Sequence, residues 1–186
     1  MKVISGIYKG RNIEGFFIDG TRPTMDRVKE SIFSMIQNYL KESVVLDLFA
    51  GSGSLGIESL SEGAAKVYLV DKNKKAINVI KKNISTIGIN NSIILNMDYK
   101  KSLDYFKEKN ILFNIIFLDP PYKTDYIEKS LSLIDEYNLL EENGIIICES
   151  DDLKKIIYSK KYINIKEKKY GDKYIVIIKK IWYTEL

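Results

Sequence analysis

The sequence predicts an α/β protein with a mostly parallel sheet that is covered by helices on both faces. Short apolar runs alternate with helical patterns through the middle of the chain. These runs are continuously apolar, which is typical of parallel strands buried on both faces. The last two runs are joined by Gly171-Asp172, which indicates a hairpin turn. We therefore expect one antiparallel strand at the end of the sheet.

The elements are expected to alternate in chain order. Strands are predicted at residues 44–49, 66–71, 93–97, 113–118, 145–149, 161–168 and 173–182. Helices are predicted at residues 54–62, 73–87, 99–109 and 125–138, with a short one after the fifth strand. The start of the chain differs, because it predicts a small β-hairpin and then an amphipathic helix, at residues 3–8, 11–17 and 24–40.

Local signals set the ends of these elements. Two glycines, at positions 51 and 53, end the first strand, and the turn Asn143-Gly144 leads into the fifth. Apolar side chains between residues 73 and 87 fall roughly on one side of a helix. We read residues 1–42 as an extension packed on a core of residues 43–186, so that the chain forms one structural domain overall.

Composition limits the class of protein and its location. The 186 residues, of which 45% are hydrophobic and 29% charged, are enough for one soluble globular domain. No apolar run approaches the ~20 residues that span a bilayer. The start of the chain has no apolar signal segment. We therefore expect a cytoplasmic monomer with no membrane partner.

The scarcity of histidine and cysteine limits the chemistry. The chain has no histidine and one cysteine, Cys148, which is expected in the core. This excludes an imidazole base, an internal disulfide and a multi-cysteine metal site, and we expect no metal. Catalysis therefore needs carboxylates, tyrosine, lysine or backbone groups, or a cofactor that carries the difficult chemistry.

The net charge of +4 is unevenly distributed along the chain. Residues 1–42 carry +2, residues 43–153 carry −5 and residues 154–180 carry +8. An acidic middle between basic ends suggests a ligand-binding core with basic surfaces for a polyanion. Lysine-rich segments are also common as solvated faces, and that alternative stays open.

A glycine-rich loop, residues 51–56, follows the first strand and opens a helix. Gly51 and Gly53 permit a tight turn and close backbone approach to a ligand. Asp71 ends the next strand, twenty positions after Gly51, where it can accept hydrogen bonds from both ribose hydroxyls. Phe49 and Lys72 flank these positions and are also predicted to bind the cofactor. The pattern G-x-G-x-x-G is literally a dinucleotide fingerprint, so NAD stays open as the cofactor.

Three further acidic positions favour S-adenosylmethionine (SAM) over NAD. Asp47 lies inside the first strand, where its carboxylate can face an ammonium group but would repel a pyrophosphate. Asp98 ends the third strand, where it can accept a hydrogen bond from an adenine amino group or cap the next helix. Asp119 ends the fourth strand, beside the expected sulfonium. Together with Asp71, these residues lie at the carboxyl ends of adjacent strands, where doubly wound sheets bind ligands.

The segment Asp119-Pro120-Pro121-Tyr122 is predicted to be catalytic. The amino group of a nucleobase is a poor nucleophile because its lone pair is delocalised into the ring. Hydrogen bonds from that group to the Asp119 carboxylate and the Pro120 carbonyl would favour a pyramidal nitrogen. Tyr122 would stack on an unpaired or flipped base, and the prolines would keep the segment stiff. The alternative is a rigid turn with no chemical role.

Basic residues near the start of the chain are predicted to contact a nucleic acid. Lys9 and Arg11 belong to a short basic hairpin that is suited to gripping phosphates. Arg22 would lie near the start of the following helix, beside the pocket, and Thr24 can cap that helix. Arg22 and Arg27 are candidates for substrate contact or for structural ion pairs.

Other charges in this helix are read as structural. Asp26 is interpreted as a first-turn charge, and Lys29 and Glu30 as surface charges.

These motifs resemble those of the class I SAM-dependent methyltransferases, and more narrowly the bacterial 16S ribosomal RNA guanine-N2 methyltransferases of the RsmD type. The resemblance covers essentially the whole chain and is most specific in residues 6–11, 22–30, 47–56 and 119–122. It implies a Rossmann-like, seven-stranded sheet with the last strand antiparallel. It also implies methyl transfer from SAM to N2 of one guanine in 16S rRNA, within small-subunit particles during ribosome assembly.

Three alternatives to that function stay open. The same tetrapeptide permits a DNA or RNA adenine amino-methyltransferase. The glycine fingerprint permits an NAD-binding oxidoreductase. A non-catalytic RNA-binding assembly factor could keep the same fold.

Overall fold

The computed structural model describes residues 1–16, 26–122 and 124–181. Its elements are α1 Asp26–Leu40, β1 Val44–Asp47, α2 Ser54–Ser61, β2 Lys66–Asp71, α3 Lys74–Ile87, β3 Ser92–Asn96, α4 Tyr99–Glu108, β4 Phe113–Leu118, α5 Tyr126–Glu136, β5 Leu140–Ser150, the 3₁₀ turn η1 Leu153–Lys155, β6 Tyr162–Tyr170 and β7 Lys173–Lys180. The predicted alternation of strands and helices is confirmed. None of the described helices is long and apolar enough to cross a membrane.

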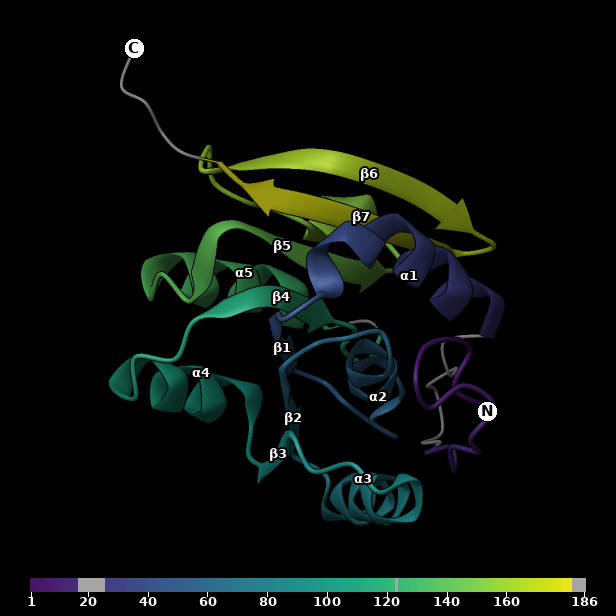
Figure 1. The fold of residues 1–186 in the computed structure, drawn as a ribbon. Helices are drawn as coiled ribbons and strands as arrows, with labels where there is room; N and C mark the ends of the chain where they lie inside the picture. Colours follow the sequence, from purple (N-terminus) through teal and green to yellow (C-terminus); the bar gives the residue numbers. More distant parts are fainter. Residues whose placement is uncertain (17–25, 123, 182–186) are drawn as a thin grey trace.

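The strands form one seven-stranded sheet in the order β3-β2-β1-β4-β5-β7-β6 (Figure 1). Every neighbouring pair is parallel except those of β7, which is antiparallel to β5 and to β6. The predicted antiparallel strand is confirmed, and Gly171 with Asp172 makes the turn of its hairpin.

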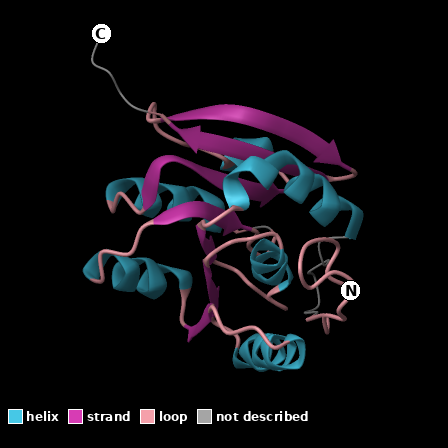
Figure 2. Ribbon diagram, in the orientation of Figure 1, coloured by secondary structure: helices cyan, strands magenta, loops and turns pink. Residues whose placement is uncertain are grey.

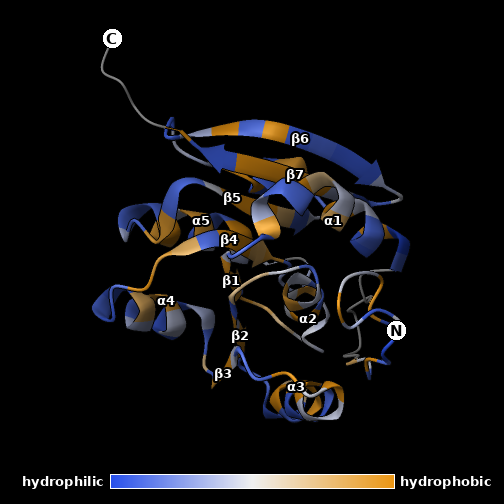
Figure 3. Ribbon diagram, viewed as in Figure 1, coloured by the Kyte–Doolittle hydropathy of each residue, from blue (hydrophilic) through white to orange (hydrophobic). Residues whose placement is uncertain are grey.

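Helices cover both faces of the sheet (Figure 2). Alternate residues of each strand enter different clusters, so that Val45 packs with α1, α2 and α3 whereas Leu46 packs with α4 and α5. This is why the central strands are apolar at nearly every position, as their colouring in Figure 3 shows. The edge strand β6 is mostly exposed and largely hydrophilic.

The chain reverses its direction across the sheet between β1 and β4. It steps outward from β1 to β2 and β3, and then returns to place β4 on the other side of β1. Asp47 pairs in register with Phe117, so the carboxyl ends of β1 and β4 lie side by side. Such a reversal leaves a crevice where open α/β sheets bind ligands.

Helix α2 lies unusually close to β2, and Gly56 makes this possible. A Cβ added at Gly56 would come within 2.4 Å of Leu69 Cδ2 and 2.8 Å of Val67 Cγ1. All eight residues of α2 are buried. The third glycine of the loop pattern therefore sets the depth of the helix against the sheet.

The N-terminal pairing is shorter than the predicted hairpin. Within residues 1–16, one antiparallel bridge joins Lys2 to Asn12, and residues 5–10 form bends and turns. The backbone here bonds to α2 instead of extending the hairpin: Ile4 N–H donates to the Glu58 carboxylate at 2.9 Å, and Ile7 N–H donates to the Ser61 carbonyl at 2.9 Å. These bonds fix the segment against the end of α2.

Lys29 is not a surface charge, and that interpretation was wrong. Its side chain is fully buried, and Nζ lies 3.0 Å from Oε2 of Glu58, which is also fully buried. Nζ also donates to the Lys2 carbonyl at 2.9 Å and to Ser54 Oγ at 3.2 Å. One ammonium group therefore joins α1, α2 and the start of the chain.

Strand β5 begins at Leu140, earlier than the predicted residue 145. Asn143 keeps the expected turn-like conformation, with a φ of 62°, but it lies inside the strand. The pairing of β4 with β5 shifts its register at this point. The sequence signal for a turn therefore marks an irregularity within the strand.

Candidate active site

One pocket opens at the carboxyl edge of the sheet, at the reversal between β1 and β4. Ten of the predicted cofactor-binding and catalytic residues line it: Asp47, Phe49, Gly51, Asp71, Lys72, Asp98, Asp119, Pro120, Pro121 and Tyr122. Residues from the N-terminal segment, Met1 and Phe16, complete part of the wall. The four carboxylates come from the ends of four strands and so approach a single space.

Asp47 is the most buried of these carboxylates, with 1% of its surface exposed. Its Oδ2 accepts the backbone N–H of Gly56 at 3.3 Å. Burial raises the pKa of Asp47 to about 7; the bond from Gly56 opposes this shift, and the nearby Asp71 carboxylate adds to it. A cation in the pocket would favour the ionised form and lower this pKa.

Asp71 holds the glycine-rich loop in place. Its two oxygens accept one backbone N–H each, from Gly51 at 2.9 Å and from Asn73 at 2.8 Å. Burial raises the pKa of Asp71 against the effect of these bonds. Gly51 has a φ of 55°, and an added Cβ would meet no atom of the described residues within 4 Å. The loop therefore presents bare backbone to the pocket.

Asp98 is the N-cap of α4, and a helix cap was one of the two roles predicted for it. Its side chain accepts the N–H of Lys100 at 2.9 Å, and it also lines the pocket. The next residue, Tyr99, joins Phe49 and Tyr126 in an aromatic wall. The Phe49 and Tyr126 rings are stacked at 6.1 Å, and the Tyr99 and Tyr126 rings lie 4.9 Å apart. The pocket therefore has a flat apolar side beside its polar edge.

The Asp119–Tyr122 segment leaves β4 at the other side of the pocket. Pro120 is buried and Pro121 exposed, and the Pro121 carbonyl accepts the Thr124 hydroxyl at 2.8 Å. Tyr122 is half-buried and lines the pocket. Its hydroxyl donates to Glu149 Oε1 at 3.4 Å, and Lys173 Nζ lies 5.1 Å from its ring centroid.

The remaining predicted site residues are placed differently. Gly53 is the N-cap residue of α2, with a φ of 79°, and is buried rather than lining the pocket. Lys9, Arg11 and Arg27 are exposed and lie outside the pocket wall.

Two predicted residues, Arg22 and Thr24, lie outside the described part of the chain. Among residues 1–16, 26–122 and 124–181, no group of three or more His, Cys, Asp or Glu side chains could hold a metal ion.

Sequence reasoning missed Tyr99 and Tyr126 as pocket residues. Each is the first residue of a helix that follows a strand on this edge, directly after an aspartate. That position was a usable signal, because a residue that opens such a helix stands beside the carboxyl ends of the strands.

Comparison with known proteins gives concordant matches over most of the chain. The family model described as conserved hypothetical protein 95 matches residues 1–179. Ribosomal RNA small subunit methyltransferase D of Haemophilus influenzae is 37% identical over 175 residues, which cover 92% of this chain and 89% of that protein. The putative rRNA methyltransferase YlbH of Bacillus subtilis is 45% identical over 152 residues, covering 81% and 83%. The solved structure of the putative methyltransferase yhhF from Escherichia coli superimposes with a TM-score of 0.84 at 27% identity, covering 97% and 98%.

The strand order, the single antiparallel strand and the glycine loop after β1 define the Rossmann-like fold of the class I methyltransferases. The predicted fold class is thereby confirmed. The chain belongs to the conserved hypothetical protein 95 family, together with the small-subunit methyltransferases D, and its resemblance to RsmD-type enzymes is confirmed.

Proposed function

We propose that this protein transfers a methyl group from SAM to the exocyclic N2 amino group of one guanine in 16S ribosomal RNA during ribosome assembly. The observation that carries the proposal is the meeting of Asp119–Tyr122 with Asp47, Asp71 and Asp98 in one pocket. The names of the relatives that are 37% and 45% identical supply the class of RNA.

The pocket suits SAM by the chemistry of its wall. Buried Asp47 would face an ammonium group, and Asp71 keeps further acceptor capacity on both oxygens for ribose hydroxyls. Asp98 and the aromatic wall of Phe49 and Tyr126 would hold an adenine ring. Gly51 lets a ligand approach the backbone, and Lys72 flanks this side of the pocket.

The chain's own contribution to transfer is alignment. SAM supplies the electrophilic methyl group when it is bound. Asp119 and the Pro120 carbonyl would accept hydrogen bonds from the two N–H groups of the target amino group. These hydrogen bonds would turn the nitrogen lone pair away from the base ring. Tyr122 would stack on the extruded base. Holding both reacting groups in one geometry accounts for most of the expected rate gain.

The remaining predicted contacts belong to this proposal. Lys9, Arg11 and Arg27 are exposed and would contact RNA phosphates, as would Arg22, with Thr24 capping its helix. The substrate would be a small-subunit particle in the cytoplasm, and the enzyme would act as a monomer without a metal.

The test uses labelled SAM, the purified protein and under-methylated small-subunit particles, followed by mapping of the label. Label on N2 of one guanine in 16S rRNA is the expected result. Label on adenine, or transfer to DNA alone, would reassign the substrate to the adenine amino-methyltransferase class. Thermal stabilisation by NAD but not by SAM would favour an oxidoreductase instead. Binding of small-subunit particles without any methyl transfer would favour the alternative of a non-catalytic assembly factor.

Cofactor affinity is expected to rise with pH up to about 7. The pKa of Asp47 is raised to about 7 in the ligand-free pocket, so the group is protonated below that pH. An ammonium group binds the ionised form, and binding below pH 7 must therefore release a proton. The association constant of S-adenosylhomocysteine should rise about tenfold per pH unit below 7 and level off above it.

Calorimetric titrations between pH 5.5 and 8 would measure this slope, and buffers of different ionisation enthalpy would count the released proton. Asp47→Asn is the control: its binding should be weaker and nearly independent of pH. A flat wild-type profile would show that Asp47 does not face the ligand's cation.

A further inference from the structure

Two charged side chains contact Tyr122 although neither lines the pocket. Lys173, at the start of β7, places its Nζ 5.1 Å from the Tyr122 ring centroid. Lys173 also forms an ion pair with Glu149 near the end of β5, and Glu149 accepts the Tyr122 hydroxyl at 3.4 Å. The antiparallel hairpin at the end of the sheet is therefore connected to the catalytic segment.

The pair is largely withdrawn from water. The Lys173 side chain is 15% exposed and the Glu149 side chain 3%. Burying two such charges is costly, and apolar side chains of similar size would often give equal stability. A buried pair beside a pocket is therefore better explained by the geometry that it imposes than by the stability that it adds.

The Lys173 ammonium contacts the Tyr122 ring from one side. An ammonium over an aromatic face is attracted to it, and Lys173 occupies one face of Tyr122 in this way. Tyr122 itself lines the pocket, whereas Lys173 and Glu149 do not. A planar partner would then stack on the other face of the ring.

We propose that Lys173, held by Glu149, is a positioning residue that orients the Tyr122 ring for stacking on the target base. This rests on the proposed function. Lys173 acts through Tyr122 and does not touch the reacting atoms.

Protonation of the cluster agrees with this role. Burial and the carboxylates of Glu149 and Asp119 raise the pKa of Tyr122 against the effect of Lys173, so its hydroxyl stays a donor. Burial opposes the charge on Lys173, but Glu149 raises its pKa overall, so the ammonium persists.

A double-mutant cycle tests whether Lys173 works through the ring. Lys173→Met should lower the single-turnover rate on small-subunit particles by about five- to thirtyfold, the range of a lost cation–π contact. Affinity for SAM should stay within about twofold, and Lys173→Arg should recover most of the rate. In a Tyr122→Ala background, Lys173→Met should cost nothing further, whereas additive losses would overturn the proposal.

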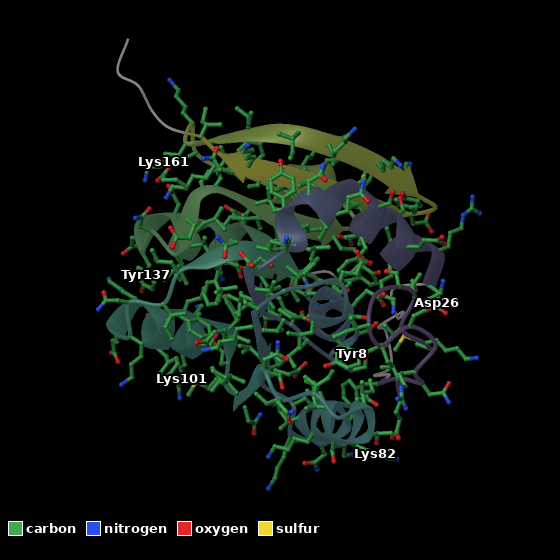
Figure 4. All side chains as sticks on the ribbon, in the orientation of Figure 1. Tyr8, Asp26, Lys82, Lys101, Tyr137 and Lys161 are labelled. Carbon is green, nitrogen blue, oxygen red and sulfur yellow. The ribbon has the colours of Figure 1, made fainter. Side chains whose placement is uncertain are left out.

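The chain offers a matched control between α4 and the end of α5. Lys107 Nζ lies 4.0 Å from the ring centroid of Tyr137, and the Tyr137 hydroxyl donates to Asp104 at 2.8 Å. This repeats the lysine, tyrosine and carboxylate arrangement outside the pocket wall, and Figure 4 labels Tyr137. Lys107→Met should leave the rate unchanged, and an equal loss in this variant would contradict a local role for Lys173.

A second readout keeps the proposal separate from the proposed function. Tyr122 ring resonances should shift in Lys173→Met, and should no longer respond to added guanosine. In a variant that lacks both charges, Lys173→Met with Glu149→Gln, the fold should persist and the same shift should appear. If wild type transfers no methyl group to rRNA, the proposed function fails. Unchanged Tyr122 resonances would overturn the positioning role in either case.

Discussion

Replacing Asp119 with alanine should lower methyl transfer at least about tenfold while leaving SAM binding largely intact. The segment that carries Asp119 leaves β4 beside the pocket, next to the end of β1. Its carboxylate would accept an N–H bond from the target amino group at the moment when the lone pair must leave the ring. That bond would be strongest in the transition state, so its loss should lower the turnover number more than substrate affinity. Single-turnover rates and calorimetric SAM affinity would measure the two effects separately.

Two further variants sharpen this prediction. Asp119→Asn keeps one acceptor oxygen, so its methyl-transfer rate should lie between those of the wild type and Asp119→Ala. Asp125→Asn changes a nearby carboxylate that is exposed, paired with Lys129 and outside the pocket wall, and should keep full turnover. A near-normal rate in Asp119→Ala would remove Asp119 from the mechanism.

The sequence predicted the fold best where buried apolar runs recur along the chain. Strands such as β2 and β4 were predicted with their observed bounds because continuous apolar runs between helices admit few other folds. The N-terminal hairpin was predicted too long. Its backbone bonds to Glu58 and Ser61 of α2, and partners so distant in the sequence leave no local pattern.

The pocket was largely predictable for the same topological reason. Residues that follow parallel strands must meet at one edge, and this applies to Asp47, Asp71, Asp98 and Asp119. Lys173 was not found, because its contact with Tyr122 depends on the register of β7 against β5. In a hairpin that is rich in lysine, no local sequence pattern predicts which lysine will contact which aromatic ring.

Lys29 gives the clearest failure of sequence reasoning and the largest expected effect on stability. A lysine near the start of an amphipathic helix is usually solvated, yet Lys29 is fully buried against Glu58. Replacing it with methionine leaves the Glu58 carboxylate buried without its cation. The free energy of unfolding should fall by about 3–5 kcal/mol, as measured by urea denaturation at neutral pH.

The exposed pair Lys82–Glu14 is the matched control, because it also ties the N-terminal segment to a helix, here α3 (Figure 4 labels Lys82). Its side chains are 66% and 47% exposed, so Lys82→Met should cost at most about 1 kcal/mol. Adding Glu58→Gln to Lys29→Met should recover part of the loss. The amide oxygen can still accept the N–H groups of Ile4 and Ser5, but no charge is left unpaired. If Lys29→Met and Lys82→Met destabilised the protein equally, burial of the Lys29 pair would have no energetic consequence, and the start of the chain would be held by its backbone bonds to α2 alone.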